Sequence, residues 1–323
     1  MDNMVDVRNL KKYFPVKGGF IQHTLGYVQA VDDISFTIQR GKVLGLVGES
    51  GCGKSTAGRT ILGLTPATEG QVLIDGVDVC TATGDAMHTL RKKMQIIFQD
   101  PYSSLDPRMT VYDLIGEGLA AHKLVSSRIE LEEKVEAIME KCGLFPEQAL
   151  RFPHQFSGGQ RQRISIARAL AASPEFVVCD EAVSALDVSI QAQIINLLKD
   201  MQEDMGLTYL FISHDLSIVR FISDDVAVMY LGQIVEMGSK KQIFDAPAHP
   251  YTQALLSAIP IPDLSMRGKP RQILKGEVKS PIEPPAGCRF ASRCPHATDE
   301  CRSRNFSLKE VEPGHHVACR LYE

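Results

Sequence analysis

The stretch GESGCGKST, residues 48–56, decides the fold class because it has the spacing of a phosphate-binding loop. It follows the apolar run VLGLV at residues 43–47 and opens a helical stretch, which is the context that such a loop requires. Its glycines allow backbone N–H groups to turn toward a phosphate, and the helix N-terminus adds partial positive charge. A glycine-rich turn that binds nothing is the alternative, but it would require neither the Lys-Ser-Thr ending nor the strand.

The residues of this loop have distinct expected roles at a bound nucleotide. Lys54 is expected to reach the β- and γ-phosphates, and the Ser55 hydroxyl to bind Mg²⁺. The remaining residues are expected to surround the phosphates: Gly48, Glu49, Ser50, Gly51, Cys52, Gly53 and Thr56. We expect Cys52 to be a small tolerated residue and not a nucleophile.

Apolar runs along the first 240 residues predict an α/β fold. Four of them lack alternation, as strands buried on both faces do, and predict a mostly parallel central sheet: residues 43–47, 96–98, 176–179 and 210–212. Better alternation at residues 28–38, and two apolar runs within residues 226–235, predict an antiparallel layer beside it. Apolar residues at helical spacing over 131–142 predict an amphipathic helix with Cys142 in the core.

Length and composition exclude several classes of protein. With 323 residues the chain is expected to form about two domains, and its 44% apolar and 23% charged residues are ordinary for a globular protein. Its net charge of -4 argues against a protein that coats nucleic acid. No run approaches the length of a membrane span, and the first residues lack the apolar core of a signal peptide. We therefore expect neither membrane insertion nor export.

A second motif, FVVCDE at residues 176–181, places two carboxylates at the end of a buried strand. Asp180 is expected to hold the water shell of Mg²⁺, and Glu181 to polarise the water that attacks the γ-phosphate. Two adjacent acids after a strand are, by themselves, commonly solvated loop residues. We therefore assign catalytic roles to this pair only because the same chain contains the phosphate-binding loop.

A third motif identifies a family. FSGGQRQR at residues 156–163 precedes the helical run 164–170 and resembles the signature sequence of ATP-binding-cassette (ABC) ATPases. Other elements of the family stand in the expected order: Gln99 is similar to its Q-loop glutamine, residues 184–187 (SALD) to its D-loop and His214 to its switch histidine. The resemblance implies an ABC ATPase cassette that includes a helical subdomain over about residues 100–170.

The resemblance also implies which residues carry the chemistry. Glu181, His214 and Gln99 are implied as the catalytic residues. Ser55, Gln99 and Asp180 are implied as the residues around Mg²⁺. The cofactors implied are therefore ATP and Mg²⁺.

In such ATPases two subunits pack head to tail. The nucleotide on Lys54 of one subunit is then covered by the signature segment of the other, and the implied nucleotide-binding residues there are Ser157, Gly158, Gly159, Gln160 and Asp187. An aromatic residue is expected to stack on adenine. Phe14 is preferred for this role, with Tyr13 and Tyr27 as the alternatives.

The C-terminal part of the sequence indicates which branch of the ABC family the chain resembles. AHPYTQALL at residues 248–256 and PAGCRFASRCP at residues 285–295 resemble the C-terminal extension of oligopeptide and dipeptide transporter ATPases. Residues 181–193 fit the same branch, although Ala182 stands where a proline is usual. Repeated prolines after residue 246 interrupt regular structure. We therefore expect a boundary near residue 240, with an ABC domain over residues 1–240 and an extension over residues 241–323.

This branch implies the ATP-hydrolysing subunit of a peptide importer. The implied partners are a second ATPase subunit, identical or related, two transmembrane permease subunits and, indirectly, an extracytoplasmic solute-binding protein, with no nucleic acid. The implied location is peripheral, on the cytoplasmic face of a bacterial inner membrane. Two alternatives stay open: a soluble ABC ATPase not tied to transport, and an ATP-sensing partner cassette that does not hydrolyse ATP. The solute stays open among dipeptides, longer peptides, glutathione, oligosaccharides and nickel chelates.

Four of the eight cysteines lie in the last 36 residues: Cys288, Cys294, Cys301 and Cys319. In a reducing compartment such a cluster predicts a metal site before it predicts disulfides. The spacing does not match the paired cysteines of zinc ribbons, and we favour a [4Fe–4S] cluster, as some members of the family carry, over zinc, with four unliganded thiols as the alternative. Three nearby histidines could substitute as ligands, but we expect them to be solvated: His296, His315 and His316. Five nearby arginines are expected either to offset thiolate charge or to form a solvated face: Arg289, Arg293, Arg302, Arg304 and Arg320.

Overall fold

The computed structural model describes residues 2–18, 23–258, 282–284 and 286–323, so residues 259–281 of the expected extension lie outside the described residues. The chain forms two compact units, and each is assembled from segments that lie far apart in the sequence. The first unit contains Met1–Asp6, Thr37–Val43 and Leu73–Ile212. The second unit contains Val7–Phe36, Leu44–Val72 and Ser213–Glu323.

The first unit is built on three parallel strands. These strands lie side by side in the order β6 (Met94–Ile97), β7 (Phe176–Asp180) and β8 (Thr208–Ser213). In register, Cys179 on β7 pairs with Ile97 on one side and with Phe211 on the other. Every residue of β7 and β8 is buried, which explains why their sequences are nearly continuous apolar runs.

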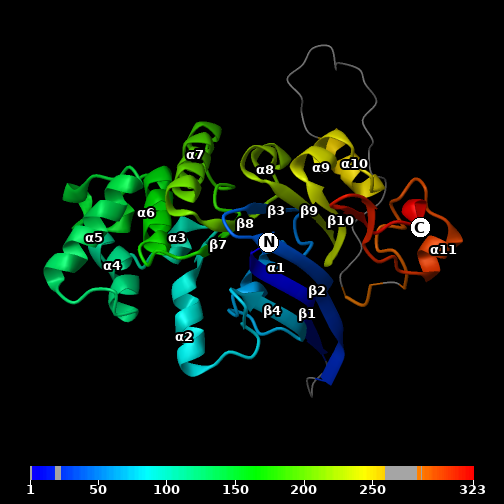
Figure 1. The fold of residues 1–323 in the computed structure, drawn as a ribbon, viewed down its shortest axis with the longest axis horizontal. Coiled ribbons are helices and arrows are strands. Elements are labelled where there is room, and N and C mark those ends of the chain that lie inside the picture. Colours follow the sequence, from blue (N-terminus) through cyan, green and yellow to red (C-terminus); the bar gives the residue numbers. More distant parts are fainter. Residues whose placement is uncertain (1, 19–22, 259–281, 285) are drawn as a thin grey trace, which may run out of the picture. The chain divides into compact units, whose positions relative to one another are not determined.

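Most helices of the first unit follow one another between β6 and β7 (Figure 1). Between these two strands lie α3 (Pro101–Ser104), α4 (Val111–Ala121), α5 (Arg128–Lys141) and α6 (Gly158–Leu170), with 3₁₀ turns at Pro146–Gln148 and Pro153–Gln155. The unit also contains α2 (Gly84–Lys93), before β6, and α7 (Val188–Met205), after β7. The helix expected over residues 131–142 is α5. Its apolar face is buried at Val135, Ile138 and Met139, and Cys142 at its C-cap is fully buried, as the spacing predicts.

The main sheet of the second unit joins an early strand to the end of the chain. Its strands lie in the order β3 (Val43–Val47), β9 (Asp225–Tyr230), β10 (Gln233–Ser239), β12 (His315–Val317) and β11 (Lys309–Glu312). The β3 and β9 pair is parallel, and the others are antiparallel. Figure 1 shows the C-terminal residues, drawn in orange and red, beside β10.

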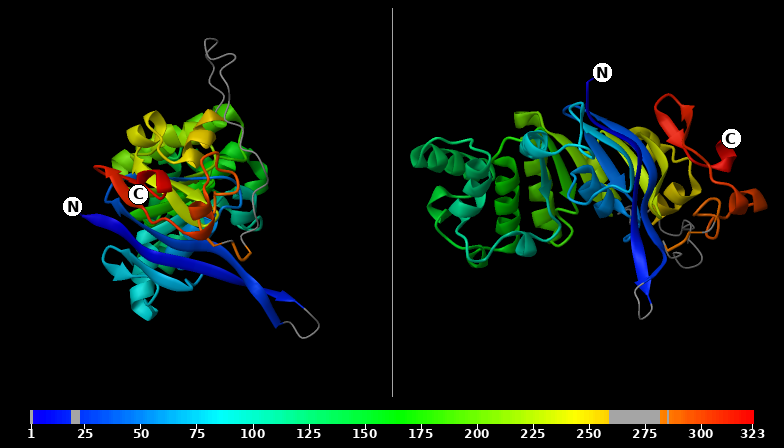
Figure 2. Two further views of the ribbon diagram at one scale, coloured as in Figure 1. Left: turned by 90° about the vertical axis from the view of Figure 1, so that its right-hand side faces the viewer. Right: turned by 90° about the horizontal axis from the view of Figure 1, so that it is seen from below.

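The second unit also contains a ribbon of two long strands. β1 (Asn3–Gly18) and β2 (His23–Gln39) run side by side (Figure 2), and β4 (Glu69–Ile74) is the other neighbour of β1. The last two residues of β4, which belong to the first unit, pair with the short β5 (Val77–Asp78) of that unit. The helices of this unit are α1 (Lys54–Ile61), α8 (Leu216–Ile222), α9 (Lys240–Asp245), α10 (Pro250–Ser257) and α11 (Asp299–Ser303), followed by a 3₁₀ turn at Arg320–Tyr322.

A buried carboxylate fastens the C-terminal residues to the sheet of the second unit. Glu236 on β10 is fully buried and accepts hydrogen bonds from the Ala248 N–H at 2.8 Å and the His249 N–H at 2.9 Å. Its Oε1 also lies 2.8 Å from Nε2 of His315 on β12. The expectation that His315 is solvated is therefore wrong, because this ring is a partner that the buried carboxylate requires.

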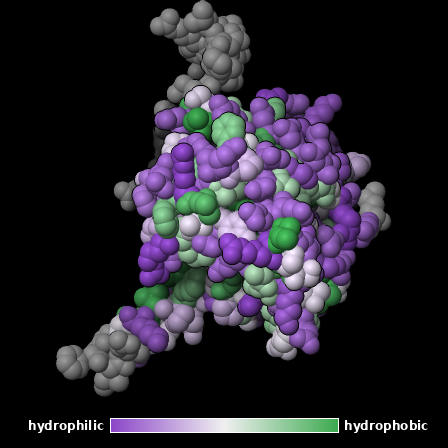
Figure 3. Space-filling view, turned by 90° about the vertical axis from the view of Figure 1, so that its left-hand side faces the viewer, coloured by the Kyte–Doolittle hydropathy of each residue, from purple (hydrophilic) through white to green (hydrophobic). Residues whose placement is uncertain are grey.

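The α/β fold predicted from the sequence is confirmed. The expected core strands are β3, β6, β7 and β8. The segments expected to form one antiparallel layer lie in two different sheets, because β2 pairs with β1, whereas β9 and β10 pair with each other beside β3. Within the described ranges, no helix combines the length and the apolar character needed to cross a membrane. On the face that Figure 3 shows, apolar side chains are scattered among hydrophilic ones, as is usual for folded domains.

We predict that Glu236→Ala lowers the free energy of unfolding by about 3 kcal/mol, because two buried N–H groups and the His315 ring lose their acceptor. Urea unfolding followed by circular dichroism measures this change. Glu312→Ala, which removes an exposed carboxylate from β11, is the matched control and should change the free energy by less than about 0.5 kcal/mol. Equal effects of the two substitutions would contradict the anchoring role of Glu236.

Candidate functional site

The phosphate-binding loop lies in the second unit, between β3 and α1. Lys54 is the first residue of α1, and its Nζ donates to the carbonyl oxygens of Gly48 at 2.9 Å and Glu49 at 3.0 Å. Lys54 is buried, so its ammonium group is held by the carbonyl groups of its own loop. Gly53, the N-cap residue, brings no side chain to this helix end, which leaves room for an anion at the partial positive charge of the N-terminus.

Backbone carbonyl groups approach the loop so closely that two of its glycines are required. A Cβ on Gly53 would lie 1.9 Å from the carbonyl oxygen of Ala30 on β2. A Cβ on Gly48 would lie 2.2 Å from the carbonyl oxygen of Met229 on β9. Gly51 differs, because it has a φ of 77° but a Cβ there would meet no atom within 4 Å. The loop is therefore fixed in place by two strands of its own unit.

C-terminal side chains contact the same loop. Arg293 forms a bidentate ion pair with Glu49, with Nη1 2.8 Å from Oε2 and Nη2 3.0 Å from Oε1. The hydroxyl of Tyr251 accepts a hydrogen bond from the Glu49 N–H at 3.0 Å. The Arg293 side chain is 8% exposed and that of Glu49 is 26% exposed, so the contact is largely shielded from water. The hydrogen bonds from Arg293 to Glu49 hold the pKa of the arginine above its usual value.

Three aromatic rings pack next to this contact. Tyr230, Tyr251 and Phe290 are all buried. The ring centroids of Tyr230 and Tyr251 are 4.6 Å apart, and Phe290 lies 5.3 Å from the first and 5.4 Å from the second. Burial lowers the pKa of His249 to about 3, so this imidazole is neutral, and its Nδ1 accepts a hydrogen bond from the Tyr251 N–H at 3.0 Å. This packing holds the Tyr251 hydroxyl at the loop.

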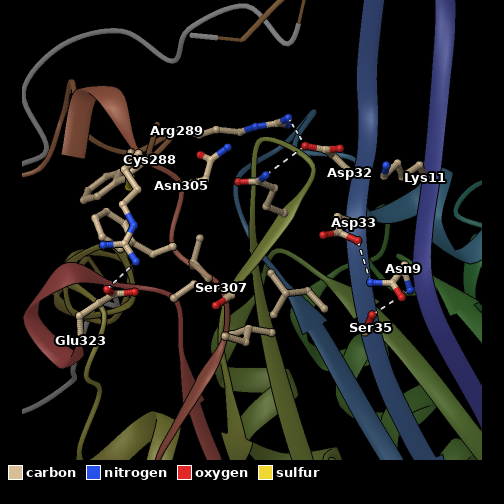
Figure 4. Close-up of a pocket in the computed structure, with 18 residues that line it drawn as sticks. Asn9, Lys11, Asp32, Asp33, Ser35, Cys288, Arg289, Asn305, Ser307 and Glu323 are labelled. Atoms are coloured by element: carbon tan, nitrogen blue, oxygen red, sulfur yellow. Dashed lines mark hydrogen bonds and ion pairs between the residues drawn. The ribbon is translucent and has the colours of Figure 1, made fainter. Parts of the chain in front are cut away.

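A second C-terminal arginine, Arg289, reaches the N-terminal strands. It lines a pocket of 610 Å³ and forms an ion pair with Asp32 on β2 (Figure 4). Asp32 also accepts hydrogen bonds from the Tyr13 hydroxyl and, at 3.0 Å, from the Gln233 amide. Neither expected role of the arginines, offset of thiolate charge or a solvated face, describes Arg289 and Arg293. Arg289 is instead a buried partner of Asp32, and the side chain of Arg293, which is largely shielded from water, is a partner of Glu49.

The candidates for stacking on adenine lie on β1 and β2. Phe14 is 40% exposed, and Nζ of Lys12 lies 4.8 Å from its ring centroid. Tyr27 is 50% exposed. The hydroxyl of Tyr13 is held by Asp32, and burial together with this hydrogen bond raises the pKa of Tyr13. The choice of Phe14 for stacking on adenine stays a prediction, and Tyr27, which is also exposed, is the alternative.

The two carboxylates of the second motif lie in the first unit, at the end of β7. Asp180 is buried as the last residue of the strand. Glu181 follows with a φ of 49°, a left-handed conformation that costs a residue with a Cβ about 1 kcal/mol. Its Oε2 accepts a hydrogen bond from Nε2 of Gln99 at 2.9 Å. The structure thus brings together two of the residues expected to be catalytic, Glu181 and Gln99.

The signature sequence forms the N-terminus of α6, also in the first unit. Ser157 caps this helix, since its Oγ accepts from the Gln160 N–H at 3.3 Å while Oε1 of Gln160 accepts from the Ser157 N–H at 3.0 Å. Ser157 and Gly158 are exposed. A Cβ on Gly159 would lie 2.7 Å from Cγ2 of Ile190 on α7, so a glycine here lets the two helices approach.

The D-loop residues lead from Glu181 to α7 within the same unit. The Ser184 hydroxyl donates to the carbonyl oxygen of Glu181 at 3.0 Å. Asp187 is the N-cap residue of α7 and is exposed, and the next residue, Val188, is 81% exposed. The first unit therefore presents two exposed helix starts that carry motif residues, at Ser157 and at Asp187.

The third residue expected to be catalytic, His214, lies in the second unit. It is exposed and stands between Ser213, the last residue of β8, and Asp215, the N-cap residue of α8. The Ser213 hydroxyl accepts from the Asp215 N–H at 3.0 Å, and Oδ1 of Asp215 accepts from the Ser217 N–H at 2.8 Å. Hydrogen bonds on both sides therefore fix the turn that carries His214.

The prediction of an iron–sulfur or other metal site at the C-terminal cysteines is wrong. Cys288, Cys294, Cys301 and Cys319 do line one small cavity of 20 Å³. Across residues 2–18, 23–258, 282–284 and 286–323, however, no three His, Cys, Asp or Glu side chains are arranged so that they could hold a metal ion. Burial raises the pKa of Cys288 to about 11, which favours a neutral thiol over the thiolate that a metal requires. Strand pairing and ion pairs hold the C-terminal segment instead.

Sequence reasoning missed the C-terminal residues that contact the loop. Tyr251 and Arg293 lie 202 and 244 residues from Glu49, so no local pattern connects them. The sequence did contain one signal, the acidic residue Glu49 inside a loop that is expected to bind a polyphosphate. Such an acid requires a cation nearby. No pattern shows which of the 35 Lys and Arg residues supplies it.

Comparison with protein families matches both parts of the chain. The family model described as ABC transporter matches residues 31–184, a range that contains the phosphate-binding loop, the signature sequence and both carboxylates. The family model described as oligopeptide/dipeptide transporter, C-terminal region, matches residues 235–301. This second range contains Glu236, Tyr251 and Arg293.

Known proteins are similar over most or all of the chain. The oligopeptide transport ATP-binding protein AppF of Bacillus subtilis strain 168 is 51% identical over 325 residues, which cover 99% of this chain and 98% of AppF. A solved dimer of the ATP-binding cassette MJ0796, in a post-hydrolysis state bound to ADP and Pi, has a TM-score of 0.65 and 27% identity, covering 73% of this chain and 99% of that chain. The structure of cbiO1 from Clostridium perfringens, part of the ABC transporter complex cbiONQ, has a TM-score of 0.65 and 27% identity, covering 76% and 92%.

We predict that Gly53→Ala lowers the free energy of unfolding by more than about 2 kcal/mol, because the new Cβ would collide with the Ala30 carbonyl at a strained backbone position. Gly51→Ala is the matched control in the same loop, since it adds left-handed strain but no collision, and it should cost about 1 kcal/mol. Urea unfolding of both variants measures the difference. If Gly51→Ala proves as destabilising as Gly53→Ala, the close approach of β2 does not constrain the loop.

Proposed function

The chain belongs to the oligopeptide/dipeptide family of ABC transporter ATP-binding subunits, and on this premise we propose how its residues perform that function. It is an ATPase that couples ATP binding and hydrolysis to peptide import through separate membrane subunits. The observation that carries this function is similarity over the whole chain to an oligopeptide transport ATP-binding protein. An ABC ATPase not tied to transport is the weaker alternative, because such a protein has no need of a transporter C-terminal region.

ATP is assigned to the loop between β3 and α1. Lys54 and the N-terminus of α1 supply positive charge to the phosphates, and the close-packed glycines let the backbone approach them. Ser55, Gln99 and Asp180 are assigned to Mg²⁺, because hydroxyl, amide and carboxylate oxygens are the ligands that this ion prefers. When bound, Mg²⁺ neutralises charge on the phosphate oxygens.

Hydrolysis is assigned to Glu181 as the general base. Its carboxylate is oriented by the hydrogen bond from Gln99, and the left-handed backbone at residue 181 turns the chain sharply at the end of β7. His214 is assigned to the γ-phosphate side of the reaction. Because the chain carries all three residues, we favour an active ATPase over an ATP-sensing partner that does not hydrolyse ATP.

A dimer of cassettes is assigned to the exposed motif residues of the first unit. Ser157, Gly158 and Asp187 are exposed at the starts of two helices, where their N–H groups and hydroxyl could cover a nucleotide held by a second subunit. The similar ATP-binding cassette MJ0796 was solved as a dimer, which supports this proposal. The partner in this dimer is a second ATPase subunit, identical or related.

Docking to a permease is assigned to a groove that follows Gln99 in the first unit. The groove measures 680 Å³ and is lined by residues 102–109 together with Leu114, Glu117 and Arg168. Tyr102 is 67% exposed at this groove, with the Arg161 guanidinium 3.7 Å from its ring centroid. We assign this groove to one helix of a membrane subunit, and we propose on this basis that the protein works peripherally, on the cytoplasmic face of a bacterial inner membrane. An extracytoplasmic protein would then recognise the solute.

We predict that Glu181→Gln reduces steady-state ATP hydrolysis at least about 100-fold, because the base is lost, while ATP-dependent pairing of subunits persists. Phosphate release and gel filtration with Mg-ATP measure the two properties. Lys54→Ala should instead lose ATP affinity, since it removes the cation of the loop. Near wild-type hydrolysis by Glu181→Gln would exclude this residue as the base.

A further inference from the structure

The phosphate-binding loop carries two opposing charges. Residues 48–56 contain one cation, Lys54, and one anion, Glu49. The Nζ of Lys54 donates to the backbone carbonyl of Glu49 itself, at 3.0 Å. Taken alone, this loop has no net charge, and a triphosphate attracted by Lys54 would be repelled by the Glu49 carboxylate.

Arg293 removes this conflict. Its guanidinium engages both carboxylate oxygens of Glu49, at 2.8 and 3.0 Å, in the bidentate geometry in which arginine and carboxylate pair most strongly. The Nη1 of Arg293 also lies 3.5 Å from the Tyr230 hydroxyl, so the arginine is held in position by a buried ring. With Glu49 neutralised, the loop together with Arg293 has a net positive charge.

The backbone of Glu49 is held by the same region of the chain. Its N–H donates to the hydroxyl of Tyr251, which packs against Phe290 at 5.4 Å between ring centroids. Glu49 is therefore fixed through its side chain by Arg293 and through its N–H by Tyr251. Both contacts come from the region that the oligopeptide/dipeptide transporter C-terminal family model matches.

We propose that Arg293 is a positioning residue of the nucleotide site, which neutralises Glu49 so that Lys54 and the N-terminus of α1 act on the phosphates without an opposing charge. Through this ion pair and the Tyr251 hydrogen bond, the C-terminal region sets the affinity of the loop for nucleotide. The inference rests on the proposed function, because it takes this loop as the ATP site. Arg302 has no such position, since its side chain is 68% exposed and pairs with Asp299 on its own short helix.

The test compares two variants of the full-length chain, Arg293→Gln and the double variant Glu49→Gln/Arg293→Gln. Binding of Mg-ATP is measured by displacement of a fluorescent ATP analogue. Arg293→Gln should raise the Kd of Mg-ATP about tenfold, because a carboxylate without its counter-charge remains in the loop. The double variant should recover most of this loss, because that carboxylate is gone. Raising the salt concentration from about 0.05 M to about 0.5 M should shrink the effect of Arg293→Gln.

Two further variants separate charge from structure. Arg293→Lys keeps the positive charge and should bind Mg-ATP within about threefold of the wild type. Arg302→Gln removes an exposed C-terminal arginine and should leave the Kd unchanged. Urea unfolding shows whether each variant is folded. If Arg293→Gln is too unstable to measure, the double variant still tests the proposal, because it is expected to bind Mg-ATP with a Kd near that of the wild type.

The proposal is overturned if folded Arg293→Gln binds Mg-ATP with the wild-type Kd. It is also overturned if the double variant binds as weakly as the single one, because a purely structural role of Arg293 would not be compensated by removing the Glu49 carboxylate. A third outcome separates the two proposals. If the wild type binds Mg-ATP, Lys54→Ala abolishes this binding and Arg293→Gln does not change it, the inference about Arg293 is overturned and the proposed function stands. Failure of the wild type to bind Mg-ATP would overturn both.

Discussion

The approach of two backbone carbonyl groups to the phosphate-binding loop is the constraint on which the candidate site depends. The carbonyl oxygens of Ala30 and Met229 occupy the places where Gly53 and Gly48 would otherwise carry side chains. The carbonyl groups of β2 and β9 cannot move without disrupting the hydrogen bonds of their strands. The sheets of the second unit therefore determine the position of the loop. The Lys54 side chain donates to the carbonyl groups of its own loop, at Gly48 and Glu49.

Pairing of carboxylates with basic side chains, together with the pairing of β12 with β10, attaches the C-terminal region to the rest of the second unit. Three carboxylates that precede residue 240 each receive a cation or an imidazole from residues 289–315: Asp32 pairs with Arg289, Glu49 with Arg293 and Glu236 with His315. In a largely buried setting the loss of one partner costs more than the pair contributes, because the remaining group keeps its desolvation penalty. The three pairs therefore fix where the C-terminal region lies more than they add to the net free energy of folding.

The sequence predicted what short-range patterns encode. The buried strands, helix α5 and the order of the motifs follow from runs of a few residues, and the phosphate-binding loop lies between strand and helix as its spacing indicates. The arginine partners of Glu49 and Asp32 could not be predicted, because they lie in chain segments more than 200 residues away. The cysteine spacing misled for a related reason. Spacing shows which thiols are close along the chain, whereas burial and neighbouring rings decide whether they ionise, and Cys288 packs beside Phe290 as a neutral thiol.

The distance in sequence between Glu49 and Arg293 also has a consequence for biosynthesis. A ribosome that has translated the loop must add 244 more residues before the counter-charge of Glu49 exists. At about 5–20 residues per second, the nascent cassette spends on the order of ten seconds or more with β3 and α1 made but their C-terminal clamp missing. The contact between Glu49 and Arg293 can therefore form only after nearly the whole chain has been synthesised.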